Sequence, residues 1–176
     1  MTRAEKNQKT RKKNCAYRTR RAIRLVRRWL PKTVEEARAL CMGALIEVGS
    51  GAFRIAYRIH GTSLLIKFPV MFDYPDPKAC HDKEGKNHTR MEVKKIWALR
   101  KHPIMRRHLP PVYYFNGRDG VMVTKYYPKS KWTNSATNQL VSEIIKEYCG
   151  VTLGDLSPDN LRAQPSSNLI FIDLGY

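Results

Sequence analysis

The residues best suited to chemistry lie in the last part of the chain. Asp155 and Asn160 are five positions apart in the segment LGDLSPDN of residues 153–160, and Asp173 follows the apolar run LIFI of residues 169–172. Magnesium prefers oxygen ligands, so one carboxylate and one amide oxygen can hold it against nucleotide phosphates. The pattern predicts magnesium-dependent phosphoryl transfer, with Asn160 and Asp173 as metal ligands and Asp155 orienting the acceptor hydroxyl.

The element that must position Asp173 is a short buried strand. Residues 169–172 are apolar over the length of a strand, and Gly175 permits a sharp backbone turn just beyond Asp173. A buried hairpin fits this pattern. Aspartate and asparagine are also common in turns and helix caps, so the motif alone is moderately specific and needs a second signal.

A glycine loop supplies that second signal. Gly49 and Gly51 lie in the segment IEVGSGAFRIAYRI of residues 46–59, which reads as strand, loop and strand, and Lys67 lies sixteen residues after Gly51 in the apolar strand pattern 64–67. Glycine lets the backbone approach phosphates, and lysine adds a point charge for their oxygens. A lysine in a strand is usually an edge or snorkelling residue. The glycine loop before Lys67 favours phosphate binding instead.

From Gly49 to Asp173, the order of these elements resembles the protein kinase-like superfamily. The segment LLIK of residues 64–67 is similar to the Val-Ala-Ile-Lys of that family, which implies that Lys67 is the phosphate-binding lysine. A helical pattern that opens at Asn87 implies Glu92 as the ion-pair partner of Lys67. Glu84 is nearer in sequence, but Gly85 and its polar neighbours argue against a helix there.

The same resemblance implies a nucleotide site and a catalytic set. Residues 121–128 are similar to the fifth strand and the hinge of the family, whose backbone bonds the adenine edge, with Thr124 at the gatekeeper position. The implied catalytic residues are Asp155, Lys67 and Glu92, and the implied metal ligands are Asn160 and Asp173. The implied ATP-binding residues are Gly49, Ser50, Gly51, Phe53, Lys67, Thr124, Lys125 and Tyr126.

Several positions depart from the family pattern. Leu153 replaces the usual catalytic-loop histidine, Gly154 replaces the arginine that pairs with a phosphorylated activation loop, and Arg54 replaces the third loop glycine. The Gly-Asp pair is similar to aminoglycoside phosphotransferases, and Asp-Leu-Ser-x-x-Asn is similar to Rio-type atypical kinases. With its end at Tyr176, the sequence resembles the compact atypical kinases of bacteriophages. A working small kinase, a nucleotide-binding relic and a truncated product are the three interpretations.

Positive charge is concentrated at the amino terminus. Residues 1–32 carry 13 Lys and Arg against the single acid Glu5, which gives +12 of the formal net charge of +18. Residues 1–14 have little apolar content and are expected to be disordered. Residues 17–30 show apolar positions at helical spacing among arginines, which predicts a basic amphipathic helix. It could bind nucleic acid or another polyanion, or dock its apolar face on the kinase lobe with solvated charges; both interpretations stay open.

The remaining signals are weaker. Thr33 and Glu36 form a capping-box pattern that predicts a helix to about Met42. Cys80, His81 and His88 offer too few ligands for an expected zinc site, and four cysteines at unrelated spacings indicate reduced thiols. No apolar run reaches the roughly 20 residues of a membrane span. The cytoplasm is therefore the expected compartment.

These patterns together predict an α+β fold. A basic arm and amphipathic helix (residues 1–32) precede a minimal kinase-like domain (residues 33–176). The first lobe of this domain, about 44–127, contains an antiparallel sheet and a helix of the αC type. The second lobe, 128–176, is severely truncated and contains a catalytic loop and a metal hairpin. The expected function is ATP- and Mg²⁺-dependent phosphoryl transfer to a protein Ser or Thr. A non-catalytic nucleotide- or polyanion-binding module is the alternative, with residues 1–30 contacting nucleic acid; oligomeric state is not predicted.

Overall fold

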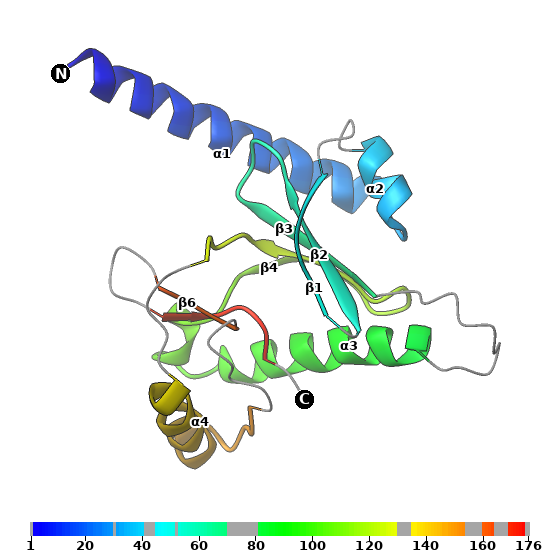
Figure 1. Cartoon of the computed structure of the whole chain (residues 1–176), viewed down its shortest axis with the longest axis vertical. Helices are drawn as coiled ribbons and strands as arrows, with labels where there is room; N and C mark the ends of the chain where they lie inside the picture. Colours follow the sequence, from blue (N-terminus) through cyan, green and yellow to red (C-terminus); the bar gives the residue numbers. More distant parts are fainter. Residues whose placement is uncertain are drawn as a thin grey trace. The chain divides into compact units, whose positions relative to one another are not determined.

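Figure 1 shows the computed structural model of the chain. The structure describes residues 2–29, 31–40, 45–51, 53–69, 81–129, 135–153, 160–163 and 169–174. The chain divides into two compact units. Unit 1 contains Met1–Lys86 and Val112–Tyr126, and unit 2 contains Asn87–Pro111 and Tyr127–Tyr176.

Unit 1 is built on a five-stranded antiparallel sheet. Its strands are β1 (Leu45–Ser50), β2 (Arg54–Ile59), β3 (Leu64–Pro69), β4 (Val112–Asn116) and β5 (Val121–Lys125), in the spatial order β1-β2-β3-β5-β4. Every neighbouring pair is antiparallel, and β3 lies at the centre. The predicted α+β class is thereby confirmed, although β4 was not predicted as a strand.

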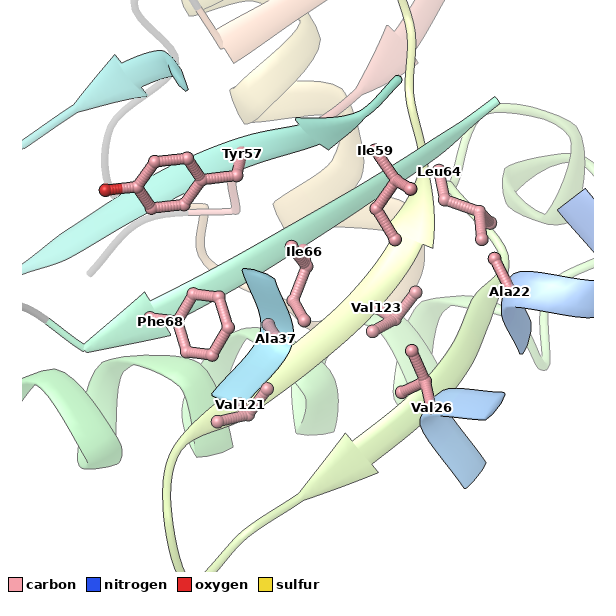
Figure 2. Close-up of a cluster of buried hydrophobic side chains, with 10 residues drawn as sticks. All are labelled: Ala22, Val26, Ala37, Tyr57, Ile59, Leu64, Ile66, Phe68, Val121 and Val123. Carbon is pink, nitrogen blue, oxygen red and sulfur yellow. The ribbon is translucent and has the colours of Figure 1, made fainter. Parts of the chain in front are cut away.

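The main core of unit 1 covers one face of this sheet. Side chains alternate along a strand, so Leu64, Ile66 and Phe68 of β3 share a face. Figure 2 shows these three side chains among seven others that come from the neighbouring strands and from two helices. The other members of the cluster are Ala22, Val26, Ala37, Tyr57, Ile59, Val121 and Val123. The residues between them on β3, including Lys67, therefore face the other side of the sheet.

Helix α1 (Arg3–Trp29) docks on this core through its carboxyl-terminal half. Ala22 and Val26 are buried in the cluster. The Ser63 backbone N–H donates to the Thr19 hydroxyl at 3.1 Å, and the Arg27 guanidinium donates to the Tyr113 carbonyl oxygen from two nitrogens at 3.0 and 2.9 Å. The interpretation that the apolar face of this helix packs on the lobe is confirmed.

The prediction that residues 1–14 are disordered is wrong, because α1 begins at Arg3. The local cause is a reciprocal capping box: the Thr2 N–H donates to the Glu5 carboxylate at 2.7 Å, and the Glu5 N–H donates to the Thr2 hydroxyl at 3.2 Å. Helix α2 (Val34–Leu40) begins where it was predicted, and the Glu36 N–H donates to the Thr33 hydroxyl at 3.2 Å.

Helix α3 (His81–Leu99) passes from unit 1 into unit 2. The sequence predicted a helix from Asn87, and Gly85 was interpreted as a sign against helix around Glu84. That interpretation is wrong, because both residues lie within α3. Gly85 is buried against the Phe53 carbonyl and Pro69, so glycine at this position lets α3 pack closely against these residues rather than ending the helix.

The described part of unit 2 contains the rest of α3, a 3₁₀ turn (Met105–Arg107), helix α4 (Ser135–Cys149) and a hairpin of β6 (Leu161–Ala163) and β7 (Leu169–Phe171). The hairpin confirms the expected pairing of the apolar strand that precedes Asp173. Helix α4 ends just before Gly150, which has φ +64°. None of the helices in the described segments is both long and apolar enough to cross a bilayer.

The close approach at Gly85 gives a first testable prediction. A Cβ at this position would lie 2.6 Å from the Phe53 carbonyl oxygen and 2.9 Å from the Pro69 Cβ. We expect Gly85→Ala to lower the free energy of unfolding by about 1–3 kcal/mol, because this overlap with backbone outweighs the gain of about 1 kcal/mol in helix propensity. Urea denaturation followed by circular dichroism measures the change. A variant as stable as the parent protein would contradict the close approach.

Candidate active site

The glycine loop joins β1 to β2 in unit 1. Gly49 pairs with Ala56 and Ser50 with Ile55, after a register shift in β1. The Gly51 N–H donates to the Arg54 carbonyl oxygen at 2.8 Å, which closes the connection between the two strands. The predicted loop residues Gly49, Ser50 and Gly51 therefore lie together at the end of β1, and Phe53 is half-buried just before β2.

Packing against the described residues does not require glycine at Gly49 or Gly51. A Cβ on Gly49 would meet no described atom within 4 Å, and one on Gly51 would meet only the Arg54 carbonyl oxygen, at 4.0 Å. The positive φ angles among the described glycines belong to Gly61, Gly120 and Gly150. Open space beside two glycines without positive φ is the arrangement that close approach of a ligand to the backbone requires.

Lys67 lies in the central strand and is only 5% exposed. Its neighbours are Ala56 on β2 and Met122 on β5. By strand alternation, Thr124 of β5, which is 2% exposed, shares the sheet face of Lys67. The interpretation of Lys67 as an edge-strand lysine is excluded, because edge strands lie at β1 and β4.

The predicted hinge follows β5. Lys125 pairs with Leu64, and the Tyr126 N–H donates to the Ser63 carbonyl oxygen at 2.8 Å. The Arg58 guanidinium lies 4.8 Å from the centre of the Tyr126 ring, a cation–π contact that the sequence did not predict. Alternation along β2 places Arg58 on the same face as Ala56, and hence on the Lys67 face of the sheet.

In unit 2, the hairpin brings Asn160 and Asp173 to one end. Leu161 pairs with Phe171, Asn160 precedes β6 and Asp173 follows β7. The Ile172 N–H donates to the Asn160 carbonyl oxygen at 2.9 Å, so the pairing continues to the residue before Asp173. Two oxygen-bearing side chains that are separated in sequence thus lie at the same hairpin end.

A residue that the sequence analysis missed anchors this end. The Lys95 amine of α3 donates to the Leu174 carbonyl oxygen at 3.1 Å. Glu92, which is 2% exposed, lies one helical turn before Lys95 on the same side of α3. Burial lowers the pKa of Lys95 below its usual value, whereas the nearby carboxylates of Asp173 and Glu92 oppose this by favouring the charged amine. Two of the three predicted acidic site residues, Glu92 and Asp173, therefore lie near one lysine.

The donors at the hairpin end suit magnesium. Asp173 offers a carboxylate and Asn160 an amide oxygen, which are the hard ligands that Mg²⁺ prefers. Within the described segments, no three His, Cys, Asp or Glu residues are placed to hold a metal by themselves. Magnesium commonly binds through one or two carboxylates together with waters and substrate phosphates, so a small donor set of this kind fits it.

The predicted site residues thus fall into two groups. Unit 1 holds Gly49, Ser50, Gly51, Phe53, Lys67, Thr124, Lys125 and Tyr126, and unit 2 holds Glu92, Asn160 and Asp173. The ion pair between Lys67 and Glu92 stays a prediction. Asp155, the predicted catalytic aspartate, lies outside the described residues. No signal in the sequence marks Lys95 as a functional residue, because a lysine on a helix is usually solvated. Its role is visible only in its tertiary contact with Leu174.

The bond from Lys95 to Leu174 gives a second prediction. A hydrogen bond from a charged donor contributes about 1.5–3 kcal/mol, so we expect Lys95→Met to open the hairpin end more often and to speed exchange of the Ile172 amide by about tenfold. Hydrogen exchange measured by NMR tests this. Lys94→Met, at an exposed neighbour on α3, is the matched control and should leave the exchange rate unchanged. Equal rates in both variants would refute an anchoring role for Lys95.

Comparisons with known proteins show no family for this chain. No protein-family model matches the sequence, and no curated protein matches it. The solved structure of PpkA-294 in its apo form is similar, with 20% identity, a TM-score of 0.46, and coverage of 73% of this chain and 56% of that chain. The chain thus spans just over half the length of that structure. A similarity at this level carries no argument about activity.

Proposed function

We propose that this chain is an ATP- and magnesium-dependent phosphotransferase of the minimal protein kinase-like type, which transfers the γ-phosphate to a hydroxyl group. The placement of Asn160 and Asp173 at one hairpin end is the observation that carries the proposal. Phosphoryl transfer needs positioning and charge neutralisation more than covalent help from the protein. Two oxygen donors fixed by backbone pairing meet that need.

Each group of residues has a distinct proposed role. The open backbone at Gly49 and Gly51 approaches the phosphates, and the Lys67 amine binds their oxygens. Residues Thr124 to Tyr126 lie along the adenine. Asn160 and Asp173 hold the magnesium ion, which, when bound, neutralises charge on the phosphate oxygens.

The remaining roles concern positioning and proton transfer. Asp155 orients the acceptor hydroxyl and accepts its proton. Glu92 pairs with Lys67 and fixes the direction of its amine. Lys95 fixes the backbone beside Asp173 through its bond to Leu174, so it is a positioning residue.

The proposed acceptor is a protein Ser or Thr, and the proposed compartment is the cytoplasm. The segment Asp155-Leu156-Ser157-x-x-Asn160 is similar to Rio-type kinases, which supports a protein acceptor. Gly154 occupies the place of the arginine that binds a phosphorylated activation loop. We therefore propose an activity that does not depend on phosphorylation of such a loop.

The open space at the glycine loop gives a third prediction. Gly51→Ala adds a methyl group that meets no described atom closer than 4.0 Å, so the melting temperature of the variant should equal or slightly exceed that of the parent protein. It should bind Mg-ATP about tenfold more weakly, because the methyl group occupies the space proposed for phosphate. Thermal shift against Mg-ATP concentration measures both quantities. Unchanged nucleotide affinity would remove the proposed role of the loop.

Phosphate transfer gives a fourth prediction. We expect Lys67→Met, Asp173→Asn and Asp155→Asn each to lower transfer from labelled ATP to a protein acceptor by about 100-fold or more, the usual effect of removing one group that stabilises the transferring phosphate. The matched controls are Lys32→Met and Glu147→Gln, at exposed positions, which should retain full activity.

The alternative is a non-catalytic nucleotide- or polyanion-binding module. Equal labelling by the parent protein and Asp155→Asn would support it and would remove the catalytic claim. In that case a thermal shift with Mg-ATP would still identify nucleotide binding.

A further inference from the structure

Basic residues follow the side of α1 that faces away from the sheet. The helix docks through Thr19, Ala22 and Val26, and residues about half a turn from these face the opposite direction. The residues of this basic face are exposed, and they are Lys6, Lys13, Arg20, Arg21, Arg24 and Arg28. Glu5 is the single acidic residue of α1. The basic face is therefore uniform in sign along the helix.

Not all arginines of α1 belong to this face. The Arg27 guanidinium is used to dock the helix on the Tyr113 carbonyl, and the Arg18 side chain lies against the turn at Gly61. Two basic residues thus contribute to the fold of unit 1. Among the described residues, those of the basic face have no comparable docking contact, and they lie on the far side of the helix from the sheet.

The amino-terminal turns of α1 extend past the sheet (Figure 1). Residues 4–14, with the sequence AEKNQKTRKKN, are exposed at every position and contain no large apolar side chain. The helical period distributes their five basic side chains around the axis. They are Lys6, Lys9, Arg11, Lys12 and Lys13. Most helices in proteins are stabilised by packing of an apolar face, and residues 4–14 have no such face. Packing within the described part of the protein therefore gives no reason for these residues to be helical and basic.

The chemistry of α1 fits dense phosphate rather than a lipid surface. A helix that lies on a membrane needs an exposed apolar face. The apolar residues Ala22 and Val26 are instead buried in the core of unit 1. Tyr17 and Trp29 are 62% and 63% exposed but are twelve residues apart, and the Arg28 guanidinium lies 5.5 Å from the Trp29 ring centre. These two residues do not form a continuous apolar face.

The distribution of basic residues around the helix axis indicates which groove of a nucleic-acid duplex the helix would fit. A helix that is basic on all sides suits a groove with phosphates on both walls. The major groove of B-form DNA, about 12 Å wide and 8.5 Å deep, admits an α-helix. The major groove of A-form RNA is too narrow for side-chain access. Asn7, Gln8 and Asn14 add amide groups to the same segment.

We infer that α1 binds duplex DNA, with residues 4–14 in the major groove and Arg20, Arg24 and Arg28 on the phosphate backbone beyond it. The helix is about 40 Å long at 1.5 Å per residue, which is enough to do both. Binding is mainly electrostatic and weakly selective for sequence, because phosphate contacts carry no sequence information directly. The inference does not depend on the proposed phosphotransferase activity.

Fluorescence anisotropy of the full chain with a labelled DNA duplex of about two helical turns, over about 50–200 mM NaCl, tests the inference. Replacing Lys6, Lys9 and Lys13 by Gln should weaken binding at least tenfold at the middle of this range. It should also reduce the slope of log affinity against log salt by about three, one for each lost phosphate contact. Replacing Lys101, Arg106 and Arg107 by Gln removes the same charge from exposed positions in unit 2 and is the control. Equal loss in both triple variants would mean that net charge alone drives binding and would overturn the inference.

A second set of arms tests the helix and the choice of partner. Gln8→Pro keeps every charge but interrupts the helix, so it should weaken DNA binding at least fivefold, with circular dichroism reporting the lost helix. Unchanged affinity would overturn the groove geometry. An RNA duplex of the same sequence, or vesicles of phosphatidylserine and phosphatidylcholine, should bind more weakly than DNA at equal salt. Tighter binding to either would overturn the assignment to DNA. The Mg-ATP thermal shift should be the same in all these variants, which separates this outcome from failure of the proposed function.

Discussion

The alternation of side chains along β3 is the constraint on which unit 1 depends. Leu64, Ile66 and Phe68 enter the core beneath α1 and α2, and this fixes Lys67 on the other face. A shift of one residue in register would bury the ammonium group in that core and expose three large apolar side chains, at a cost of several kcal/mol. The core that stabilises the sheet is therefore also what positions the lysine. Stability and the placement of this functional group follow from one pattern.

Unit 2 positions its polar groups by backbone rather than by core packing. The hairpin holds Asn160 and Asp173 at one end, and the Lys95 amine holds the next carbonyl, that of Leu174. Such bonds have direction, so they fix where a carboxylate lies more closely than apolar contact does. The carboxylates of Asp173 and Glu92 in turn favour the charged form of the Lys95 amine. The Lys95 side chain thus both fixes the backbone at Leu174 and lies near the two carboxylates.

The sequence predicted those elements whose own residues carry the signal. Strands β1, β2, β3, β5 and β7 have apolar patterns or flanking glycines, and α2 has a capping box. Strand β4 was missed because its residues are half-buried on both faces, which leaves no alternation to detect. The first turns of α1 were missed because they have no apolar pattern, only helix-forming residues and the cap at Thr2 and Glu5. Lys95 could not be recognised, since its partner, Leu174, is distant in sequence and the bond is made by a backbone carbonyl.

The described glycines differ in how much space surrounds them. Gly85 is glycine because the Phe53 carbonyl and Pro69 leave no room for a Cβ, and Gly120 combines φ +68° with a close approach to Lys86. Gly49 and Gly51 meet neither condition, although any L-residue there would lower the entropy of the unfolded chain and so favour folding. Glycine at these two positions therefore lowers stability without a gain in packing against the described part of the chain. Open space beside the backbone at Gly49 and Gly51 is what the proposed approach of phosphate to this loop requires.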